Sequence, residues 1–304
     1  MKLLLLGCNG QVGWELQRSL AVLGDVVALQ RDASCNPQGL SGDLGDTPGL
    51  EDTITRVQPD VIVNAAAYTA VDRAEAEPDD SHQINALAPA VIARSATKTG
   101  AFVVHYSSDY VFDGGGDQPW QETDAPSPLS AYGRSKLAGD EAVARCPRHL
   151  ILRTSWVYGV RGGNFPRTML RLAQERDQLS VVSDQWGAPT SAALLADITA
   201  HCLHQLARNP ALAGLYHCAA SGTTSWHGYA QQLFQQARAL GWALRATPDK
   251  VLPVSSSHYP TVARRPANSR LDCSRLQTRF GLRLPPWQQG LTHWLQSISE
   301  SPSA

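Results

Sequence analysis

The chain has 304 residues, of which 43% are hydrophobic and 17% are charged, and it carries 26 Lys and Arg against 27 Asp and Glu. A chain of this length and composition can bury a large apolar core, and it is neither a disordered segment nor a coiled coil. Its formal net charge of −1 provides no broad cationic surface, which argues against a nucleic-acid partner.

The six cysteines lie far apart, and none of them forms the Cys-x-x-Cys pair of a metal or redox site. This spacing is typical of free thiols in a reducing compartment and argues against a zinc site. The first apolar run, residues 2–6, is shorter than the roughly 7 residues that a secretion signal needs in its core. No later stretch approaches the roughly 20 apolar residues of a membrane helix. We therefore expect a soluble, cytoplasmic protein without a membrane partner.

Short apolar runs alternate with helical patterns in the first half of the chain. Continuous apolar strands separated by helices are typical of a parallel sheet that is covered on both faces. The sequence therefore predicts a Rossmann-type, doubly wound α/β domain that binds NAD(P) over residues 1–156. Strands are expected at residues 2–6, 26–29, 61–63, 102–106 and 150–153, and helices at residues 11–23, 48–57, 81–99 and 131–144.

The second half has a looser pattern, which predicts a smaller mixed α/β lobe for substrate binding over residues 157–304. The boundary is approximate, and some elements can return to the first domain. Residues 244–270 hold four prolines and are too long for an idle connection, so we expect them to cover a ligand. Strands are expected at residues 179–182 and 215–218, helices at 192–206 and 228–240, and a frayed tail at 297–304.

The first predicted strand leads directly into a glycine-rich turn that contains Gly7, Gly10 and Gly13. Glycines at a strand-to-helix turn let the backbone approach a pyrophosphate, and the start of the next helix offers free N–H groups. A tight turn without any ligand would also explain an isolated glycine pattern. The position of this one within alternating strands and helices favours a dinucleotide cofactor.

The end of the second predicted strand indicates which dinucleotide is bound. A site for NAD usually offers a carboxylate to the adenosine ribose at this point. Here Arg31 precedes Asp32, and a planar guanidinium suits the 2′-phosphate of NADPH. We therefore expect NADPH, with NADH also accepted because Asp32 can still reach a ribose. Asp43 and Leu44 are candidates to flank the adenine, although an ordinary loop would explain them as well.

Tyr132 and Lys136 lie four residues apart at the start of a predicted helix, so their side chains share one face. Ser108, at the end of the fourth predicted strand, should meet them, because ligands of a parallel sheet gather beyond the carboxyl ends of its strands. Ser108 could hydrogen-bond a substrate carbonyl while Tyr132 protonates its oxygen. We expect Lys136, an oxidised nicotinamide and burial to lower the pKa of Tyr132 from about 10 toward 7, which takes roughly 4 kcal/mol. A packing tyrosine beside a solvated lysine is the alternative.

Three arginines in the second half, Arg264, Arg265 and Arg270, suit a nucleotide diphosphate. A guanidinium can bind two phosphate oxygens at once, which a lysine cannot do. For at least one of the three, a solvated basic loop is the alternative.

Longer motifs extend over nearly the whole chain. They are Gly-Cys-Asn-Gly-Gln-Val-Gly-Trp-Glu-Leu from Gly7, Val-Asn-Ala-Ala-Ala-Tyr-Thr-Ala-Val-Asp from Val63, His-Tyr-Ser-Ser-Asp-Tyr-Val-Phe from His105, Arg-Thr-Ser-Trp-Val-Tyr-Gly from Arg153, Asp-Gln-Trp-Gly-Ala-Pro-Thr from Asp184 and Ala-Arg-Arg-Pro-Ala-Asn-Ser-Arg-Leu from Ala263. Together they resemble the dTDP-4-dehydrorhamnose reductases, a family of extended short-chain dehydrogenases/reductases. The resemblance implies NADPH-dependent reduction of the 4-keto group of dTDP-4-dehydro-L-rhamnose, the last step to dTDP-L-rhamnose for surface polysaccharide such as O-antigen.

The resemblance also implies roles for individual residues. Tyr132 would be the proton donor, and Lys136 would tune it. The pyrophosphate would lie at Gly10, Gln11 and Val12, and the rest of the cofactor along Ala66, Ala67, Tyr68, Thr69 and Tyr106. The sugar would contact Ser108, Asp109 and Trp156, although core packing would also explain Trp156.

Some members of the family are described as pairing through a magnesium ion that several glutamates hold. Glu15 is present here, but Ala193 stands where an acid is expected, and residues 295–299 contain none before Glu300. One exposed carboxylate is too few for a hard cation. We therefore expect no metal, and either a monomer or a homodimer.

Three other functions are possible on the same fold. A nucleotide-sugar 4,6-dehydratase would have an Asp-Glu pair at the strand end, whereas Asp109 is followed by Tyr110. A 4-epimerase usually needs no acid after the serine, so Asp109 argues modestly against it. A non-catalytic regulatory subunit that binds NADP can lose the Tyr/Lys pair or the arginines, and both are retained here. The sequence therefore favours a reductase.

Overall fold

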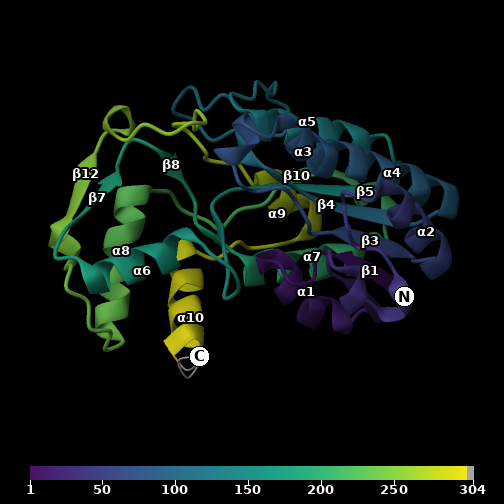
Figure 1. The fold of residues 1–304 in the computed structure, drawn as a ribbon, viewed down its shortest axis with the longest axis horizontal. Helices are drawn as coiled ribbons and strands as arrows, with labels where there is room; N and C mark the ends of the chain where they lie inside the picture. Colours follow the sequence, from purple (N-terminus) through teal and green to yellow (C-terminus); the bar gives the residue numbers. More distant parts are fainter. Residues whose placement is uncertain (300–304) are drawn as a thin grey trace.

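The computed structural model describes residues 1–299 and shows two lobes of unequal size (Figure 1). The larger lobe is built on one six-stranded sheet in the order β10-β5-β4-β3-β1-β2, and every pairing in it is parallel. The predicted Rossmann-type α/β fold is therefore confirmed. The strands of this sheet are β1 (Lys2–Leu6), β2 (Asp25–Leu29), β3 (Val61–Asn64), β4 (Phe102–Ser108), β5 (His149–Thr154) and β10 (Gly214–His217).

Helices cover both faces of this sheet because successive residues of each strand point to opposite sides. In β1, Leu3 and Leu5 belong to one core, whereas Leu4 and Leu6 belong to the other, and all four are fully buried. The first core includes α1 (Gln11–Ala21), α7 (Ala192–Leu206) and α9 (Ser274–Phe280). The second core includes α2 (Thr47–Val57), α4 (Ala88–Thr99) and α5 (Ala131–Ala144).

The smaller lobe has its own core, which is rich in aromatic side chains. In it, β7 (Leu179–Val182) pairs with β12 (Val251–Val254) in parallel. Three helices pack on this lobe: α6 (Phe165–Glu175), α8 (Trp226–Ala239) and α10 (Trp287–Ser299). Two further short pairs are β6 (Val157–Tyr158) with β9 (Thr190–Ser191), and β8 (Trp186–Gly187) with β11 (Thr224–Ser225).

The chain passes between the lobes more than once after β5. The helices α7 and α9 and the strand β10 come from the second half of the sequence, yet they pack on or join the large sheet. As a result, loops of the second half meet the carboxyl ends of β4 and β5, where the predicted catalytic residues lie.

One helix predicted over residues 81–99 is interrupted. The chain forms α3 (Pro78–His82), then a wide π turn (Gln83–Leu87), and only then α4. Asn85 lies in this turn, accepts the N–H of Tyr68 at 2.9 Å and donates to the Tyr68 carbonyl at 3.0 Å. These contacts hold the widened turn in place, as is common for π turns near functional sites.

The sequence prediction missed three helices, α6, α9 and α10, and some order in the proline-rich stretch. The helix α6 begins with a proline in its first turn, where the missing N–H costs nothing. Residues 244–270 contain β12 and two 3-10 turns, Pro248–Lys250 and Ser256–His258, because pairing with β7 orders them. In the predicted tail, residues 297–299 belong to α10, and residues 300–304 lie outside the described part.

In residues 1–299, no helix is long and apolar enough to cross a membrane.

Candidate functional site

The glycine turn after β1 is too tight for side chains. Gly7 has φ of +79°, and a Cβ there would lie 2.8 Å from the Cβ of Ala66. A Cβ on Gly13 would lie 2.0 Å from the carbonyl oxygen of Gly7. Gly10 is the N-cap of α1 and makes no side-chain capping bond, so the first N–H groups of this helix remain available to a ligand. This cradle fits a cofactor pyrophosphate at the point where the strand order reverses between β1 and β3.

The next two residues of α1 take different roles. The side chain of Gln11 accepts a hydrogen bond from Asn164 Nδ2 at 3.0 Å, which ties the glycine turn to the loop before α6. Val12 packs against the core of the sheet. These two residues therefore face the predicted pyrophosphate mainly with their backbone N–H groups.

Two charged residues follow β2: Arg31, whose guanidinium is exposed, and Asp32, whose carboxylate already accepts hydrogen bonds. Arg31 is exposed, whereas Asp32 accepts the Ser34 N–H at 2.9 Å and the Ser34 hydroxyl at 2.7 Å. These hydrogen bonds lower the pKa of Asp32 and hold its carboxylate at a turn. Arg31 is thus better placed than Asp32 to meet an added phosphate.

Asp43 and Leu44 are placed differently from each other. Asp43 accepts the N–H of Gly45 at 2.9 Å, while the side chain of Leu44 is 4% exposed and lies in the core. An adenine could therefore meet only the backbone of Leu44, and the role of both residues stays a prediction.

The loop after β3 is held by side chains that the sequence prediction did not include. The phenol hydroxyl of Tyr68 donates a hydrogen bond to Glu77 at 2.6 Å, and this bond is the main cause of the raised pKa of Tyr68. Ala67 and Thr69 are exposed, whereas Ala66 is half-buried beside Gly7. Backbone groups at Ala66 and exposed side chains at Ala67 and Thr69 are thus free to line a cofactor, while the phenol of Tyr68 is already engaged.

Ser108, Tyr132 and Lys136 come together at the carboxyl end of β4. The helix α5 begins just before Tyr132, because Ser130 caps it by accepting the Gly133 N–H at 3.1 Å. The Ser108 side chain hydrogen-bonds to Tyr132, and Lys136 Nζ donates to the carbonyl of Tyr106 at 2.6 Å. Ser108 and Lys136 are 7% and 2% exposed, whereas Tyr132 is half-buried, so the phenol is the most accessible member of the group.

Tyr106 contributes to this group with its backbone. Its phenol lies 2.6 Å from the Thr199 hydroxyl of α7. Burial raises the pKa of that phenol strongly, so it stays neutral. The side chain is half-buried, and its predicted contact with the cofactor stays a prediction.

Burial controls the charge states at the centre of the site. It raises the pKa of Tyr132 well above the ordinary value, and the Ser108 side chain opposes this only in part. Our expectation that burial helps to lower this pKa has the wrong sign, because a low-polarity environment disfavours the phenolate. The phenol consequently carries its proton at neutral pH, as a proton donor must. Burial also lowers the pKa of Lys136 to about 8.

Asp109 is a buried acid next to Ser108. Its carboxylate accepts the Ser108 hydroxyl at 3.1 Å, and its Oδ2 has no hydrogen-bond partner within residues 1–299. Burial raises its pKa to about 6, against the hydroxyls of Ser269 and Ser108, which lower it. An unpaired carboxyl oxygen at this point is suited to the hydroxyl of a bound sugar.

Trp156 follows β5 in a strained conformation. Its φ is +51°, which is rare for a bulky residue and common at functional sites. Its ring stacks on Trp226 at 3.6 Å between centroids, and a Cβ on Gly187 would lie 2.7 Å from it. Stacking explains part of its position, whereas ordinary packing does not require the strained backbone. The predicted sugar contact stays a prediction.

The three arginines of the second half have different surroundings. Arg265 forms an ion pair with Asp72 at 2.8 Å and hydrogen-bonds to Tyr110, whose ring meets that of Tyr132 edge-on. Arg264 is exposed. Arg270 Nε donates to Asn268 Oδ1 at 2.8 Å. Arg265 is therefore linked to Tyr132 through Tyr110, and a diphosphate would compete with Asp72 for it.

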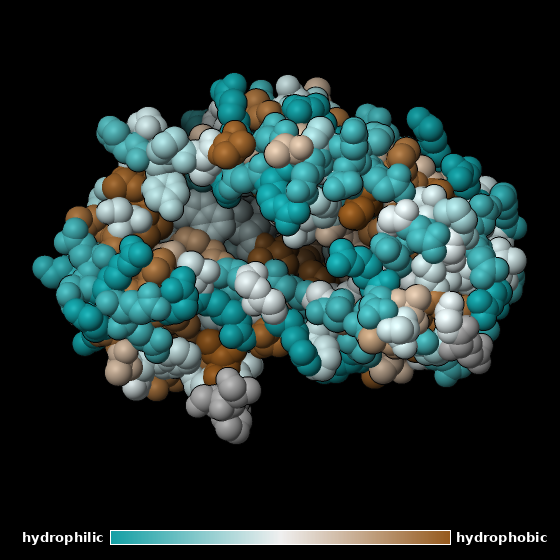
Figure 2. Space-filling model, in the orientation of Figure 1, coloured by the Kyte–Doolittle hydropathy of each residue, from teal (hydrophilic) through white to brown (hydrophobic). Residues whose placement is uncertain are grey.

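The surface is hollowed between the two lobes, and hydrophobic residues lie at the bottom of the hollow (Figure 2). The carboxyl ends of β4 and β5 approach the second lobe, since Asn268 donates its N–H to the Gly114 carbonyl at 3.0 Å and Trp156 stacks on Trp226. A substrate that binds between the lobes could thus reach Tyr132 and the strap of residues 263–270 together.

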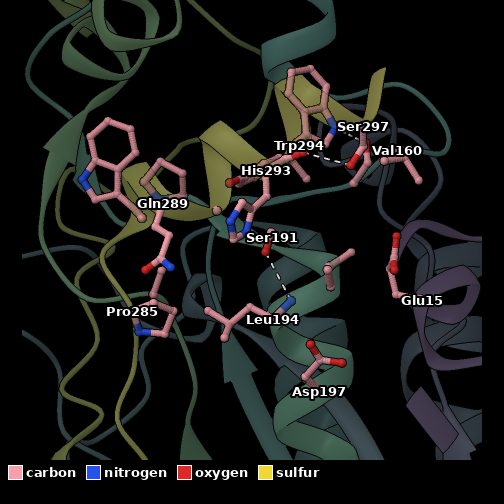
Figure 3. A pocket seen from close by; sticks show the side chains of 18 of the residues that line it. Glu15, Val160, Ser191, Leu194, Asp197, Pro285, Gln289, His293, Trp294 and Ser297 are labelled. Carbon is pink, nitrogen blue, oxygen red and sulfur yellow. Dashed lines mark hydrogen bonds between the residues drawn. The ribbon is translucent and has the colours of Figure 1, made fainter. Parts of the chain in front are cut away.

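A separate pocket of about 290 Å³ contains Glu15, the remaining candidate for a magnesium ligand (Figure 3). Asp197 and His293 also line it, but in residues 1–299 no group of three or more His, Cys, Asp or Glu could hold a metal ion. Asp197 instead accepts hydrogen bonds from Arg18 at 3.0 Å and Ser19 at 2.6 Å. These residues do not fit a divalent cation, and Glu300 lies outside the described residues.

Sequence reasoning missed four residues that organise the site: Asp72, Asn85, Ser130 and Ser269. A serine just before a predicted helix is a recognisable capping signal, so Ser130 could have been found. Asn85 hydrogen-bonds to Tyr68 and Ser269 to Asp109, and both partners lie far away in the chain. No local pattern marks them.

Comparison with known proteins agrees with this arrangement. The family model of the RmlD substrate binding domain matches residues 1–300. The chain is 53% identical to dTDP-4-dehydrorhamnose reductase of Salmonella typhimurium and 50% identical to that of Escherichia coli K12, each over 299 residues and 98% of both chains. The crystal structure of dTDP-4-dehydrorhamnose reductase from Bacillus anthracis in complex with NADP matches with a TM-score of 0.86 and 33% identity, over 97% of this chain and 99% of that one. The chain therefore belongs to the dTDP-4-dehydrorhamnose reductase family.

Proposed function

We propose that this protein uses NADPH to reduce the 4-keto group of dTDP-4-dehydro-L-rhamnose and so forms dTDP-L-rhamnose. The observation that carries the proposal is the meeting of Ser108, Tyr132 and Lys136 in a largely buried group beyond β4. A protonated phenol beside a hydroxyl and a buried amine is what the reduction of a ketone requires. Family membership supplies the identity of the sugar nucleotide.

The glycine turn and Arg31 are assigned to the cofactor. Gly7, Gly10 and Gly13 would hold the pyrophosphate with the free N–H groups of α1, and Arg31 would bind the 2′-phosphate. When bound, NADPH supplies the hydride that the sugar carbon receives.

The chain's own residues supply the proton and the orientation. The Ser108 hydroxyl hydrogen-bonds the substrate carbonyl oxygen, and Tyr132 donates the proton that turns this oxygen into a hydroxyl. Lys136 stabilises the phenolate that remains on Tyr132. Exclusion of water by burial strengthens each of these interactions.

The sugar nucleotide would lie between the lobes. Asp109 and Trp156 are assigned to the sugar ring, and Arg264, Arg265 and Arg270 to the diphosphate. The oligomeric state and the cytoplasmic location are predictions that rest on the sequence alone.

The test is a direct assay. When purified protein is mixed with NADPH and the 4-keto sugar nucleotide, the absorbance of the reduced nicotinamide should fall. NMR should identify dTDP-L-rhamnose as the product. Retention of the absorbance in the presence of intact substrate would refute the proposal. Loss of water from the sugar, or inversion at C4 without net oxidation of NADPH, would indicate a dehydratase or an epimerase instead.

A further inference from the structure

The face of α5 that holds Tyr132 and Lys136 continues to a third residue, Asp140. The three residues stand at every fourth position, so their side chains lie on the same side of the helix. Asp140 and Lys136 are each 2% exposed. A buried carboxylate is costly unless opposite charges and hydrogen bonds compensate for the lost water. The burial of Asp140 one turn beyond Lys136 therefore calls for compensating partners.

Neighbouring strands hold the carboxylate of Asp140 in place. From β5, Arg153 Nε donates to Oδ2 at 3.0 Å. Burial raises the pKa of Asp140, and the charges of Arg153 and Lys136 and the Ser107 hydroxyl oppose this and favour the carboxylate. The second oxygen, Oδ1, has no hydrogen-bond partner within residues 1–299 and lies 3.9 Å from Nε2 of His105. Burial holds the pKa of His105 well below its ordinary value, so this ring is neutral and cannot balance the charge.

The buried group thus contains two cations and one anion. Lys136 is oriented by its 2.6 Å hydrogen bond to the Tyr106 carbonyl, which carries no full charge. Burial lowers the pKa of Lys136 to about 8, and the nearby carboxylate of Asp140 raises it. Without that carboxylate, the amine would lose its proton more readily, and the buried guanidinium of Arg153 would lose its partner.

We propose that Asp140 is a positioning residue of this reductase, whose buried carboxylate, anchored by Arg153, keeps the Lys136 side chain charged and in place beside Tyr132. Asp140 acts mainly through Lys136, and its negative charge also raises the pKa of Tyr132, which helps this phenol to keep its proton. The inference rests on the proposed function, since it gives Asp140 a part in the work of the Tyr132/Lys136 pair.

The chain allows a direct test because its only lysines are Lys2, Lys98, Lys136 and Lys250. In protein labelled with ¹³C at the lysine side chains, NMR titration can follow Lys136, whose signal is identified by its loss in K136R. In D140N, which keeps the shape and removes the charge, the pKa of Lys136 should fall by about one unit or more. The alkaline limb of the kcat profile should move toward lower pH by a similar amount. KM for the sugar nucleotide should stay within about twofold of the wild-type value.

Glu141 provides a matched control, because it is the neighbouring acid on the same helix and is exposed. E141Q makes the same change of charge and should leave both the Lys136 titration and the pH profile unchanged. D140E should restore most of the wild-type profile. If D140N does not fold, D140N/R153Q removes the uncompensated guanidinium as well and should show the same shift.

Two results would overturn the proposal. One is a Lys136 titration that is the same in wild type and in the folded Asp140 variant, and the other is a kcat that falls equally at every pH. The NMR titration needs no catalytic activity. A wild-type protein without reductase activity would therefore refute the proposed function, while the titration would still decide the role of Asp140.

Discussion

Arg265 and Asp72 form an ion pair, with 2.8 Å between Nη2 and Oδ2, that joins the proline-rich stretch of the second half to the loop after β3. Asp72 also accepts the N–H of Ala263 at 3.1 Å. Arg265 hydrogen-bonds to Tyr110 as well, and the ring of Tyr110 meets that of Tyr132 edge-on. The ion pair and Tyr110 thus connect a cation of the proline-rich stretch to the proposed proton donor.

Loss of this cation should weaken substrate binding. We expect R265A to raise KM for the sugar nucleotide more than about tenfold, because a guanidinium can bind two diphosphate oxygens at once. Steady-state kinetics at saturating NADPH measures this. R208A removes an exposed arginine that follows the C-terminal end of α7 and should leave KM unchanged. An unaltered KM in R265A would remove Arg265 from the binding site.

Removal of the Tyr132 hydroxyl should separate binding from chemistry. Y132F should bind NADPH with the wild-type affinity and reduce the substrate at least about a hundredfold more slowly, as expected for the loss of a general acid. Fluorescence titration with NADPH and single-turnover kinetics test the two parts. Turnover at the normal rate would show that another group donates the proton.

Arg31 should determine the cofactor preference. We expect R31A to raise KM for NADPH about tenfold and to leave KM for NADH nearly unchanged, since only the former carries the 2′-phosphate. Asp32 is held by Ser34 and cannot easily replace the lost contact. Kinetics with both cofactors decides this, and a clear preference of the wild type for NADH would contradict the assignment.

The glycine turn should not tolerate a methyl group at Gly13. The added Cβ of G13A would lie 2.0 Å from the Gly7 carbonyl oxygen, so the backbone of the turn must move. We expect weaker NADPH binding together with a loss of stability of about 1–3 kcal/mol. G163A is the control, because a Cβ at that position has nothing within 4 Å. Equal NADPH affinity in the two variants would show that the turn does not hold the cofactor.

Asp109 should make the stability of the fold depend on pH. Its folded pKa of about 6 lies above the ordinary 3.8, so the folded state binds the proton more tightly than the unfolded state. The contribution of this group is therefore greatest below pH 4 and is lost as the pH rises through 6. D109N removes this dependence and should gain about 3 kcal/mol relative to wild type between pH 4 and pH 7.

Urea denaturation of both proteins across that range measures the difference. Parallel stability curves would indicate that Asp109 is ionised without penalty. The same substitution should reduce catalysis, because the unpaired Oδ2 that is suited to the sugar is lost.

The sequence by itself determined the features that depend on neighbouring residues. The alternation of apolar strands with helices predicted the parallel sheet, and all six of its strands begin within one residue of their predicted starts, including Lys2 and Phe102. The glycine turn after β1 and the Tyr132/Lys136 spacing on α5 could be found in the same way. In each case the geometry of one strand, turn or helix fixes the relation between the residues.

The tertiary structure alone decided the features that depend on contacts between distant parts of the chain. It placed β10 beside β5, Asn85 against Tyr68, and Asp72 against Arg265. It also set the charge states, because the pKa of a buried group depends on everything that packs around it. No local pattern carries that information. The sequence could propose Ser108, Tyr132 and Lys136 as candidate groups, whereas burial in the folded structure fixed the proton on Tyr132.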